Sequence, residues 1–293
     1  MWDWVLNFPE DWVFGWDLIK IIDHAVDWII INGEAFFEAI NIGVLRGILI
    51  PLEKALLWAP WWAVIVLTGI VAWRAVSVRF AIITAAFLLF MPFMGLLDDA
   101  AVTLSITLAS TIICIVLGLP LGIIAAKSDR FDNFLRPILD SMQTMPSFVY
   151  LIPAVMLFGM GPVPAVMATV IYAIPPIIRL TSLGIRQVMP SAVEAARSFG
   201  ASPGQVLAKV QVPLALPTIL AGLNQTIMMA LAMVVIASMI GARGLGEEVL
   251  VGISRLEPGR GFIAGTCIVF LAIILDRISQ GIARRRQVQT VTQ

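Results

Sequence analysis

Long apolar runs, separated by short polar stretches, repeat along most of the chain and set its expected architecture. A helix needs about 20 apolar residues to cross a bilayer. The candidate runs fall at residues 57–73, 80–97, 101–126, 147–160, 162–179, 214–240 and 262–276. The fourth run is short and joins the fifth through Gly159-Met160-Gly161-Pro162, a turn signature. The pattern predicts an all-α polytopic membrane protein with about seven spans.

The first 56 residues follow a different pattern, with nine acidic and three basic residues. Charged positions recur at spacings of three and four, at Asp17, Lys20, His24 and Asp27. Apolar residues fill the other face, which is typical of an amphipathic helix, and several tryptophans suit the headgroup boundary. We therefore expect an interfacial helix on the outer leaflet. The alternative is an extra span over residues 25–52, which Glu34, Glu38 and Arg46 disfavour because charge in hydrocarbon is costly.

Composition narrows the class of protein. Hydrophobic residues make up 60% of the chain and charged residues 13%, and the mean hydropathy is +0.96. These values exclude a soluble enzyme and a disordered chain, since globular domains are about 25% charged. The net charge is zero, which leaves no basic surplus for nucleic acid. A single histidine predicts no metal site, and Cys114 and Cys267 lie in apolar runs as expected core residues.

Lysine and arginine predict the orientation. If the C-terminus, with Arg284-Arg285-Arg286, lies in the cytoplasm, alternation back through the spans places roughly two thirds of the basic residues inside. The N-terminus is then outside. The chain divides into an acidic external tail (1–56), two accessory transmembrane helices (57–97), a core (98–280) and a basic cytoplasmic tail (281–293).

Residues 186–213 form the longest polar stretch between two spans, on the predicted cytoplasmic side. Pro190 can open a short helix that Gly200 ends. Ser202, with the glutamine three residues later, can form a capping box that begins a second helix, and we expect Pro213 to end it. One interpretation is a simple connector that covers its neighbours.

The residues in this stretch also resemble a known motif. Glu194-Ala195-Ala196, then Gly200, then Val210-Gln211-Val212-Pro213 resembles the cytoplasmic EAA loop of permease subunits in bacterial ABC importers. Valines stand where the family pattern has isoleucine and leucine. Further stretches resemble one branch of the family, the permeases for glycine betaine, proline betaine and choline, at residues 142–153, 171–181, 241–246 and 271–277. Arg243 departs from that branch, which more often has a small residue there.

The resemblance implies the type I ABC importer permease fold, with a methionine-permease-like five-helix core, in the bacterial inner membrane. It implies a second copy of this chain, two copies of a cytoplasmic ATPase subunit and an external or periplasmic substrate-binding protein. The expected substrates are quaternary-ammonium or related methylated-amine solutes, trimethylamine N-oxide among them. ATP and Mg belong to the ATPase, so we expect no enzyme activity and no cofactor in this chain, which has no Gly-x-x-x-x-Gly-Lys-Ser/Thr loop.

Three sets of residues are candidates for function. The ATPase-coupling loop implied by the resemblance comprises Glu194, Ala195, Ala196, Gly200 and Pro213. A low-affinity translocation pathway is expected to use Met145, Tyr150, Tyr172, Asn224 and Gln225. Docking of the binding protein is expected to use Asp98, Asp99, Glu247 and Glu248.

Each pathway or docking assignment has a structural alternative. Aromatic faces suit quaternary ammonium ions, and amides inside a span are costly and often functional. The amides could instead bond a neighbouring helix, and the methionine could be packing. Asp98 or Asp99 could simply cap the following helix.

Two other functions are alternatives for the whole chain. An ion-coupled secondary transporter usually shows inverted repeats and paired charges at mid-membrane, and the span interiors lack such pairs. A structural or assembly membrane protein would carry no transport activity. Neighbouring genes for an ATPase and a secreted binding protein would distinguish the importer from both.

Overall fold

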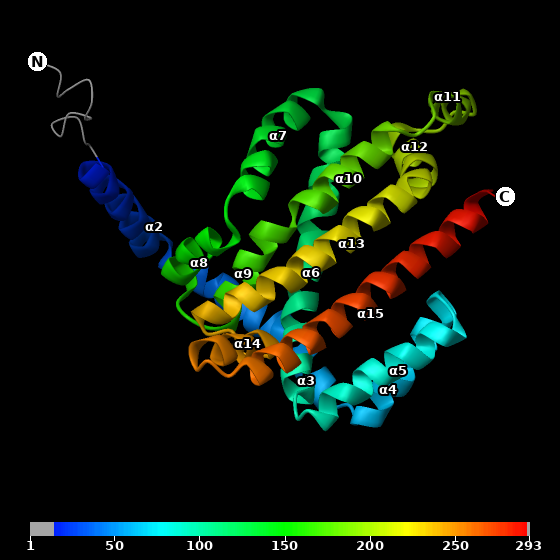
Figure 1. The fold of residues 1–293 in the computed structure, drawn as a ribbon. Coiled ribbons are helices and arrows are strands. Elements are labelled where there is room, and N and C mark those ends of the chain that lie inside the picture. Colours follow the sequence, from blue (N-terminus) through cyan, green and yellow to red (C-terminus); the bar gives the residue numbers. More distant parts are fainter. Residues whose placement is uncertain (1–14, 292–293) are drawn as a thin grey trace, which may run out of the picture.

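Every regular element over residues 15–291, the range that the computed structural model describes, is helical (Figure 1). In chain order the elements are α2 (Gly15–Val44), the π turn η2 (Leu45–Leu49), α3 (Ile50–Trp58), α4 (Trp61–Ala75), α5 (Val78–Phe93), α6 (Leu97–Lys127), α7 (Asp129–Thr144), the 3₁₀ turn η3 (Ser147–Tyr150), α8 (Leu151–Phe158), α9 (Pro162–Ala173), α10 (Pro175–Arg186), α11 (Pro190–Ser198), α12 (Pro203–Val206), the π turn η4 (Leu207–Gln211), α13 (Val212–Ala237), the 3₁₀ turn η5 (Ser238–Ile240), α14 (Leu245–Ser254) and α15 (Pro258–Val291). The all-α prediction is confirmed for this range.

The centre of the bundle is α10, which packs between α6 and α13. Glycines on both neighbours allow the close approach. A Cβ at Gly122 of α6 would lie 2.6 Å from the Thr181 Cβ atom, and one at Gly222 of α13 would lie 2.9 Å from the Leu180 Cβ atom. Since bundle helices in a bilayer associate largely through such close packing, these contacts fix the core.

Five helical stretches are long and apolar enough to cross a membrane: Leu18–Trp58, Leu97–Lys127, Pro162–Arg186, Pro203–Ile240 and Pro258–Ala283. The prediction of a separate span at residues 147–160 is wrong. This segment forms one arm of a pair with α7 that is bent by 108°. Pro146 causes the break, because its extended backbone (ψ 132°) and missing N–H end the helix at Thr144. The two accessory helices, α4 and α5, have only 15 and 16 residues and pack on α15.

The predicted N-terminal helix is present and is longer than its amphipathic part. It runs from Gly15 through η2 to Trp58. With a mean hydropathy of 1.6 it is also apolar enough to be a span. Figure 1 shows α2 running across the direction of α13 and α15 rather than along it. Its place in the interface stays a prediction. Residues 1–14 of the acidic tail, with Trp2, Trp4 and Trp12, and the last two residues of the basic tail lie outside the described residues.

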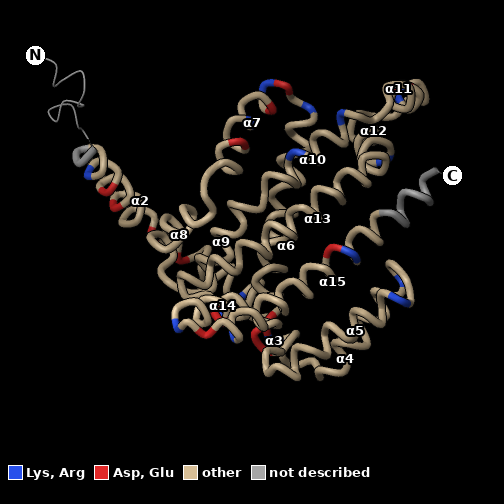
Figure 2. Tube along the Cα trace, in the orientation of Figure 1, with Lys and Arg blue, Asp and Glu red and all other residues tan. Residues whose placement is uncertain are grey.

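The segments predicted to be cytoplasmic lie together at one end of the bundle. They are the α4–α5 turn, the α6–α7 turn, α11 and the C-terminal part of α15 (Figures 1 and 2). The helix α14 and the α5–α6 turn lie at the opposite end. The alternation of loops predicted from the basic residues is therefore reproduced by the fold.

The prediction that Pro213 ends a helix is wrong. The chain is continuously helical from Pro203 to Ile240. The π turn η4 makes this possible: the Val212 N–H donates to the Leu207 carbonyl, five residues back, and the wider turn accommodates the proline that follows. The same arrangement precedes Pro51, where the Ile50 N–H donates to the Leu45 carbonyl.

Candidate coupling loop, pathway and docking surface

The helix α11 projects from one end of the bundle (Figure 1). It begins at Pro190, as predicted, and none of its residues is buried. Glu194 and Ala195 are exposed, and Ala196 is half-buried. Phe199, which is not among the candidate residues predicted from the sequence, lies directly after the helix and is 92% exposed. This exposed aromatic ring and the two alanines give α11 a slim apolar face. Helices with such a face commonly bind in a groove of a partner protein.

Gly200 ends α11, as predicted. Its φ is +81°, a left-handed conformation that favours glycine. The Gly200 N–H donates to the Arg197 carbonyl (2.9 Å) and the Ala201 N–H to the Ala196 carbonyl (3.1 Å). These two bonds form a Schellman motif, which satisfies carbonyls at the end of the helix and fixes the direction in which the chain leaves it.

The second helix begins with the predicted capping box. The Gln205 N–H donates to Ser202 Oγ (3.4 Å), and the Ser202 N–H donates to Gln205 Oε1 (2.9 Å). Because the helix continues without a break through η4 into α13, α11 is joined to a membrane-crossing helix by one sharp bend and one wide turn.

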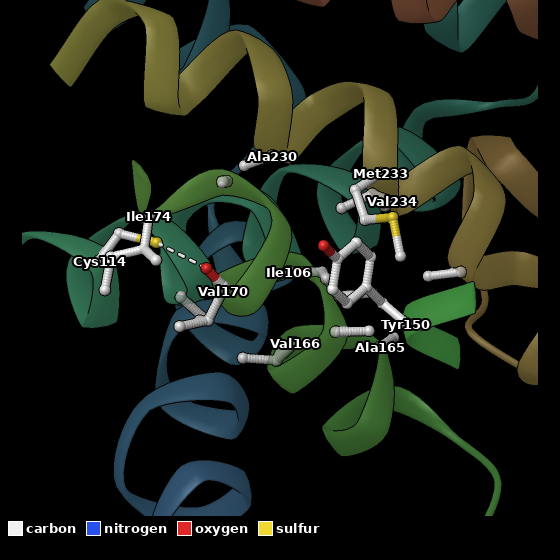
Figure 3. Packing of buried hydrophobic residues seen from close by; sticks show 14 of the residues in the cluster. Ile106, Cys114, Tyr150, Ala165, Val166, Val170, Ile174, Ala230, Met233 and Val234 are labelled. Atoms are coloured by element: carbon white, nitrogen blue, oxygen red, sulfur yellow. Dashed lines mark hydrogen bonds between the residues drawn. The ribbon is translucent and has the colours of Figure 1, made fainter. Parts of the chain in front are cut away.

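The two tyrosines proposed for the pathway lie near each other, with ring centroids 6.2 Å apart. Figure 3 shows the Tyr150 ring among core side chains that include Ile106, Ala165 and Met233. Tyr150 is only 5% exposed, and its hydroxyl donates to the Met142 carbonyl (2.7 Å). In this conformation Tyr150 thus connects the two arms of the bent α7–α8 pair, and its role in a pathway stays a prediction.

The other pathway candidates lie directly after α7 or on α13. Met145 is exposed at the end of α7, and Gln225 is exposed on α13. Asn224 points to α15, where its Nδ2 donates to Asp276 Oδ1 (2.8 Å). Asn224 therefore bonds a neighbouring helix, as the structural alternative for this residue predicts. Asp276, expected at the end of a span, lies well inside α15.

The acidic residues proposed for docking lie in the first turns of two neighbouring helices. Asp98 and Asp99 lie in the first turn of α6, and Glu247 and Glu248 lie in the first turn of α14. Thr103 joins the turns, because its Oγ1 donates to the Asp99 carbonyl (2.8 Å) and accepts from the Leu245 N–H (2.9 Å).

The alternative that Asp98 or Asp99 caps α6 is wrong. The helix already begins at Leu97, and Leu96, at the cap position, makes no side-chain bond to it. The carboxylates instead lie within the first turn, where the positive end of the helix dipole stabilises them.

Arg260, which is not among the candidate residues predicted from the sequence, organises this acidic end. Its Nε donates to Glu248 Oε2 (2.5 Å) and its Nη2 to Glu248 Oε1 (2.9 Å). This bidentate pair joins α15 to α14. The hydrogen bond from Arg260 lowers the pKa of the Glu248 carboxyl below its ordinary value.

The pair predicts an acid-dependent loss of stability. Because the pKa of Glu248 is lower in the folded chain, its stabilising contribution is complete above the ordinary glutamate pKa and disappears as the pH falls through the lowered value. Glu248→Gln should therefore lower the melting temperature at neutral pH and reduce its fall toward acid. Glu247→Gln, at the exposed neighbouring position, should change neither. Equal effects of the two variants on thermal unfolding between neutral and acid pH would contradict the assignment.

Comparison with known proteins extends these observations. Residues 118–288 match the binding-protein-dependent transport system inner membrane component family. The chain is 49% identical over 263 residues to the glycine betaine/proline betaine transport system permease protein ProW of Escherichia coli (strain K12), covering 90% of this chain and 74% of that protein. It is 45% identical over 283 residues to the glycine betaine/carnitine transport permease protein GbuB of Listeria monocytogenes serotype 1/2a (strain 10403S), covering 95% and 98%.

A solved structure of the MetNI methionine ABC transporter, in an inward-facing conformation, has the same fold. It superposes with a TM-score of 0.58 at 22% sequence identity, over 67% of this chain and 97% of that one. The predicted methionine-permease-like core is confirmed by this likeness.

Proposed function

Because the chain belongs to the family of binding-protein-dependent transport system inner membrane components, we propose that it is the permease subunit of an ATP-driven importer for quaternary-ammonium or related methylated-amine solutes. Glycine betaine and proline betaine, named for the Escherichia coli relative, and carnitine, named for the Listeria relative, share a bulky methylated nitrogen. The chain transports the solute, while a partner subunit binds ATP and Mg and hydrolyses the nucleotide.

One observation carries this proposal most strongly. The exposed helix α11, with Glu194-Ala195-Ala196, leads through the left-handed Gly200 into a helix that is continuous with α13. Such a helix can sit in a groove of a cytoplasmic partner. Ala195 and Ala196 keep it slim, and Glu194 offers a carboxylate to a basic group of the partner. When two ATPase subunits close on ATP, they move α11 of each of two permease copies and with it the membrane helices.

The proposed orientation follows from this assignment. The end of the bundle that carries α11 and the C-terminus lies in the cytoplasm, and the N-terminus lies outside. Asp98, Asp99, Glu247 and Glu248 then face the exterior, where they receive basic groups of the substrate-binding protein. That protein selects the solute, and the permease offers a low-affinity route for which Met145, Tyr150, Tyr172, Asn224 and Gln225 remain the candidates.

Reconstitution tests the function directly. The chain, its ATPase and its binding protein are placed in proteoliposomes, with the binding protein outside and ATP inside, and uptake of labelled glycine betaine is measured. We expect uptake that requires all three proteins and ATP. Choline, carnitine and trimethylamine N-oxide in competition define the substrate range. Uptake that continues without the ATPase and follows an ion gradient would contradict the proposal.

The comparisons do not support the alternative of an ion-coupled secondary transporter, because the matching family is defined by dependence on a binding protein. The fold argues in the same direction. Over the described residues, the long-range ion pairs join α7 to α10 and α14 to α15. None of these pairs joins two of the five candidate spans, whereas ion-coupled transporters pair charges between membrane-crossing helices.

A further inference from the structure

A polar cluster connects α13 and α15 inside the apolar bundle. Asn224 Nδ2 donates to Asp276 Oδ1 (2.8 Å), and Gln280 Nε2 donates to the same oxygen (2.7 Å). Ser279 Oγ lies within hydrogen-bonding reach of both Asn224 Oδ1 and the Asp276 carbonyl. All four residues are half-buried. Asp276 takes part in none of the ion pairs of the described part of the chain, and the hydrogen bonds to its carboxylate come from the amides of Asn224 and Gln280.

Such a cluster is costly in a helix that crosses a membrane. The cost is reduced most while both helices stay in contact. Separating α13 from α15 would leave the Asn224 amide without its partners on α15 and the Asp276 carboxylate with only the Gln280 amide, in apolar surroundings. The cluster therefore favours one fixed arrangement of the two helices over others.

The cluster also connects two of the helices that cross the membrane. Among the described residues it is the only side-chain-to-side-chain hydrogen-bonded connection between two of the five candidate spans. At one end, α13 continues through η4 and α12 to the bend at Gly200. At the other end, α15 carries Arg260, which holds Glu248 of α14. Figure 1 shows α13 and α15 running side by side between these ends.

We propose that Asn224 and Asp276 are positioning residues that make α13 and α15 move as one rigid body, so that a displacement of α11 reaches the acidic docking surface on α14. The proposal rests on the proposed import function, since it assigns a route for the coupling motion. It gives Asn224 a role different from substrate contact. The two roles predict different outcomes when the pair is exchanged.

The exchange experiment uses the complete reconstituted transporter. Asn224→Asp alone places two carboxylates together and should reduce transport about tenfold or more, while ATP hydrolysis without substrate continues. The double exchange, Asn224→Asp with Asp276→Asn, restores one carboxylate and one amide and should return transport to near the unmodified level. If the exchanged pair stays as impaired as the single variant, or the single variant transports normally, the proposal is wrong.

A cross-linking experiment tests rigid-body motion itself. Asn224→Cys and Asp276→Cys are introduced together in a chain that carries Cys114→Ala and Cys267→Ala, and the thiols are joined by a short bifunctional thiosulfonate. We expect the double-cysteine variant to be impaired before linking, because it lacks the polar connection, and the link to raise its ATP-driven uptake, since the two helices need not separate. The single-cysteine variants with the same reagent serve as controls. Arrest of uptake by the link, or failure of the two thiols to link, would overturn the proposal.

Uptake by the unmodified transporter, measured with and without ATP, distinguishes a failure of this inference from a failure of the proposed import function. If its uptake proves independent of ATP, the import function fails. The cross-linked pair still shows in that case whether α13 and α15 must separate during transport.

Discussion

Gly200→Asp should leave the chain folded and inserted while separating ATP hydrolysis from transport. The φ of +81° costs a side chain about 1–2 kcal/mol, and aspartate tolerates this conformation better than most residues. A Cβ at this position would meet nothing within 4 Å, so no clash adds to the cost. The substitution instead places backbone strain and a carboxylate at the bend between α11 and α12, where the coupling motion is expected to act. We expect transport to fall about tenfold or more while basal ATP hydrolysis continues, measured together in proteoliposomes.

Gly95 supplies a matched control for this variant. It ends α5 in the same Schellman motif, with the Gly95 N–H donating to the Pro92 carbonyl (3.1 Å) and the Leu96 N–H to the Met91 carbonyl (3.0 Å). Its φ is +73°, and a Cβ there also meets nothing within 4 Å. Gly95→Asp thus introduces similar strain at the opposite end of the bundle and should leave coupling intact. Normal transport by Gly200→Asp would refute the coupling assignment, and equal loss in both variants would show a general effect of strain.

Gly252→Ala should be among the most destabilising small changes in the chain. A Cβ on Gly252 of α14 would lie 2.6 Å from the Gly261 nitrogen and 2.7 Å from the Gly261 Cα atom of α15. Both obstacles are backbone, so the hairpin of α14 and α15 must open rather than repack a side chain. We expect a loss of about 3 kcal/mol, at the upper end of typical overpacking costs. Thermal unfolding of the purified chain in detergent measures it.

The control for Gly252 lies in the same hairpin. Gly265 is inside α15, and a Cβ there meets nothing within 4 Å. Gly265→Ala should stabilise the helix by up to about 1 kcal/mol, since alanine has the higher helix propensity. A shift of the melting temperature in the same direction for both variants would contradict the close approach of α14 and α15.

The sequence predicts those features that depend on neighbouring residues. Gly200 and the Ser202 capping box act through bonds to residues three to five positions away, and Pro190 acts through its missing N–H at the first helical position; the structure confirms each of them. The prediction for Pro213 fails for the opposite reason. A proline need not end a helix where the turn before it is wide, and the π turn at Leu207–Gln211 has no reliable sequence signal.

Contacts between distant segments explain the remaining differences. Asn224 and Asp276 are 52 residues apart, and their hydrogen bond depends on how α13 packs on α15. Arg260 reaches Glu248 only because α14 folds back onto α15. The 108° bend after α7 similarly places Tyr150 where its hydroxyl meets the Met142 carbonyl. Periodicity along the chain does not predict these contacts, although charged and amide residues inside apolar runs indicate positions where a polar contact is needed.

The sidedness of α11 tests the central claim most directly. Phe199→Cys, at a position 92% exposed beside Gly200, is introduced in the chain with Cys114→Ala and Cys267→Ala, and Met160→Cys, at a position 79% exposed on the opposite end, serves as the reciprocal control. A membrane-impermeant maleimide is applied to sealed spheroplasts and to inverted vesicles. We predict that the thiol at position 199 reacts only in inverted vesicles and the thiol at position 160 only in spheroplasts. Labelling of position 199 in sealed spheroplasts would contradict the account, because no cytoplasmic ATPase could then hold α11.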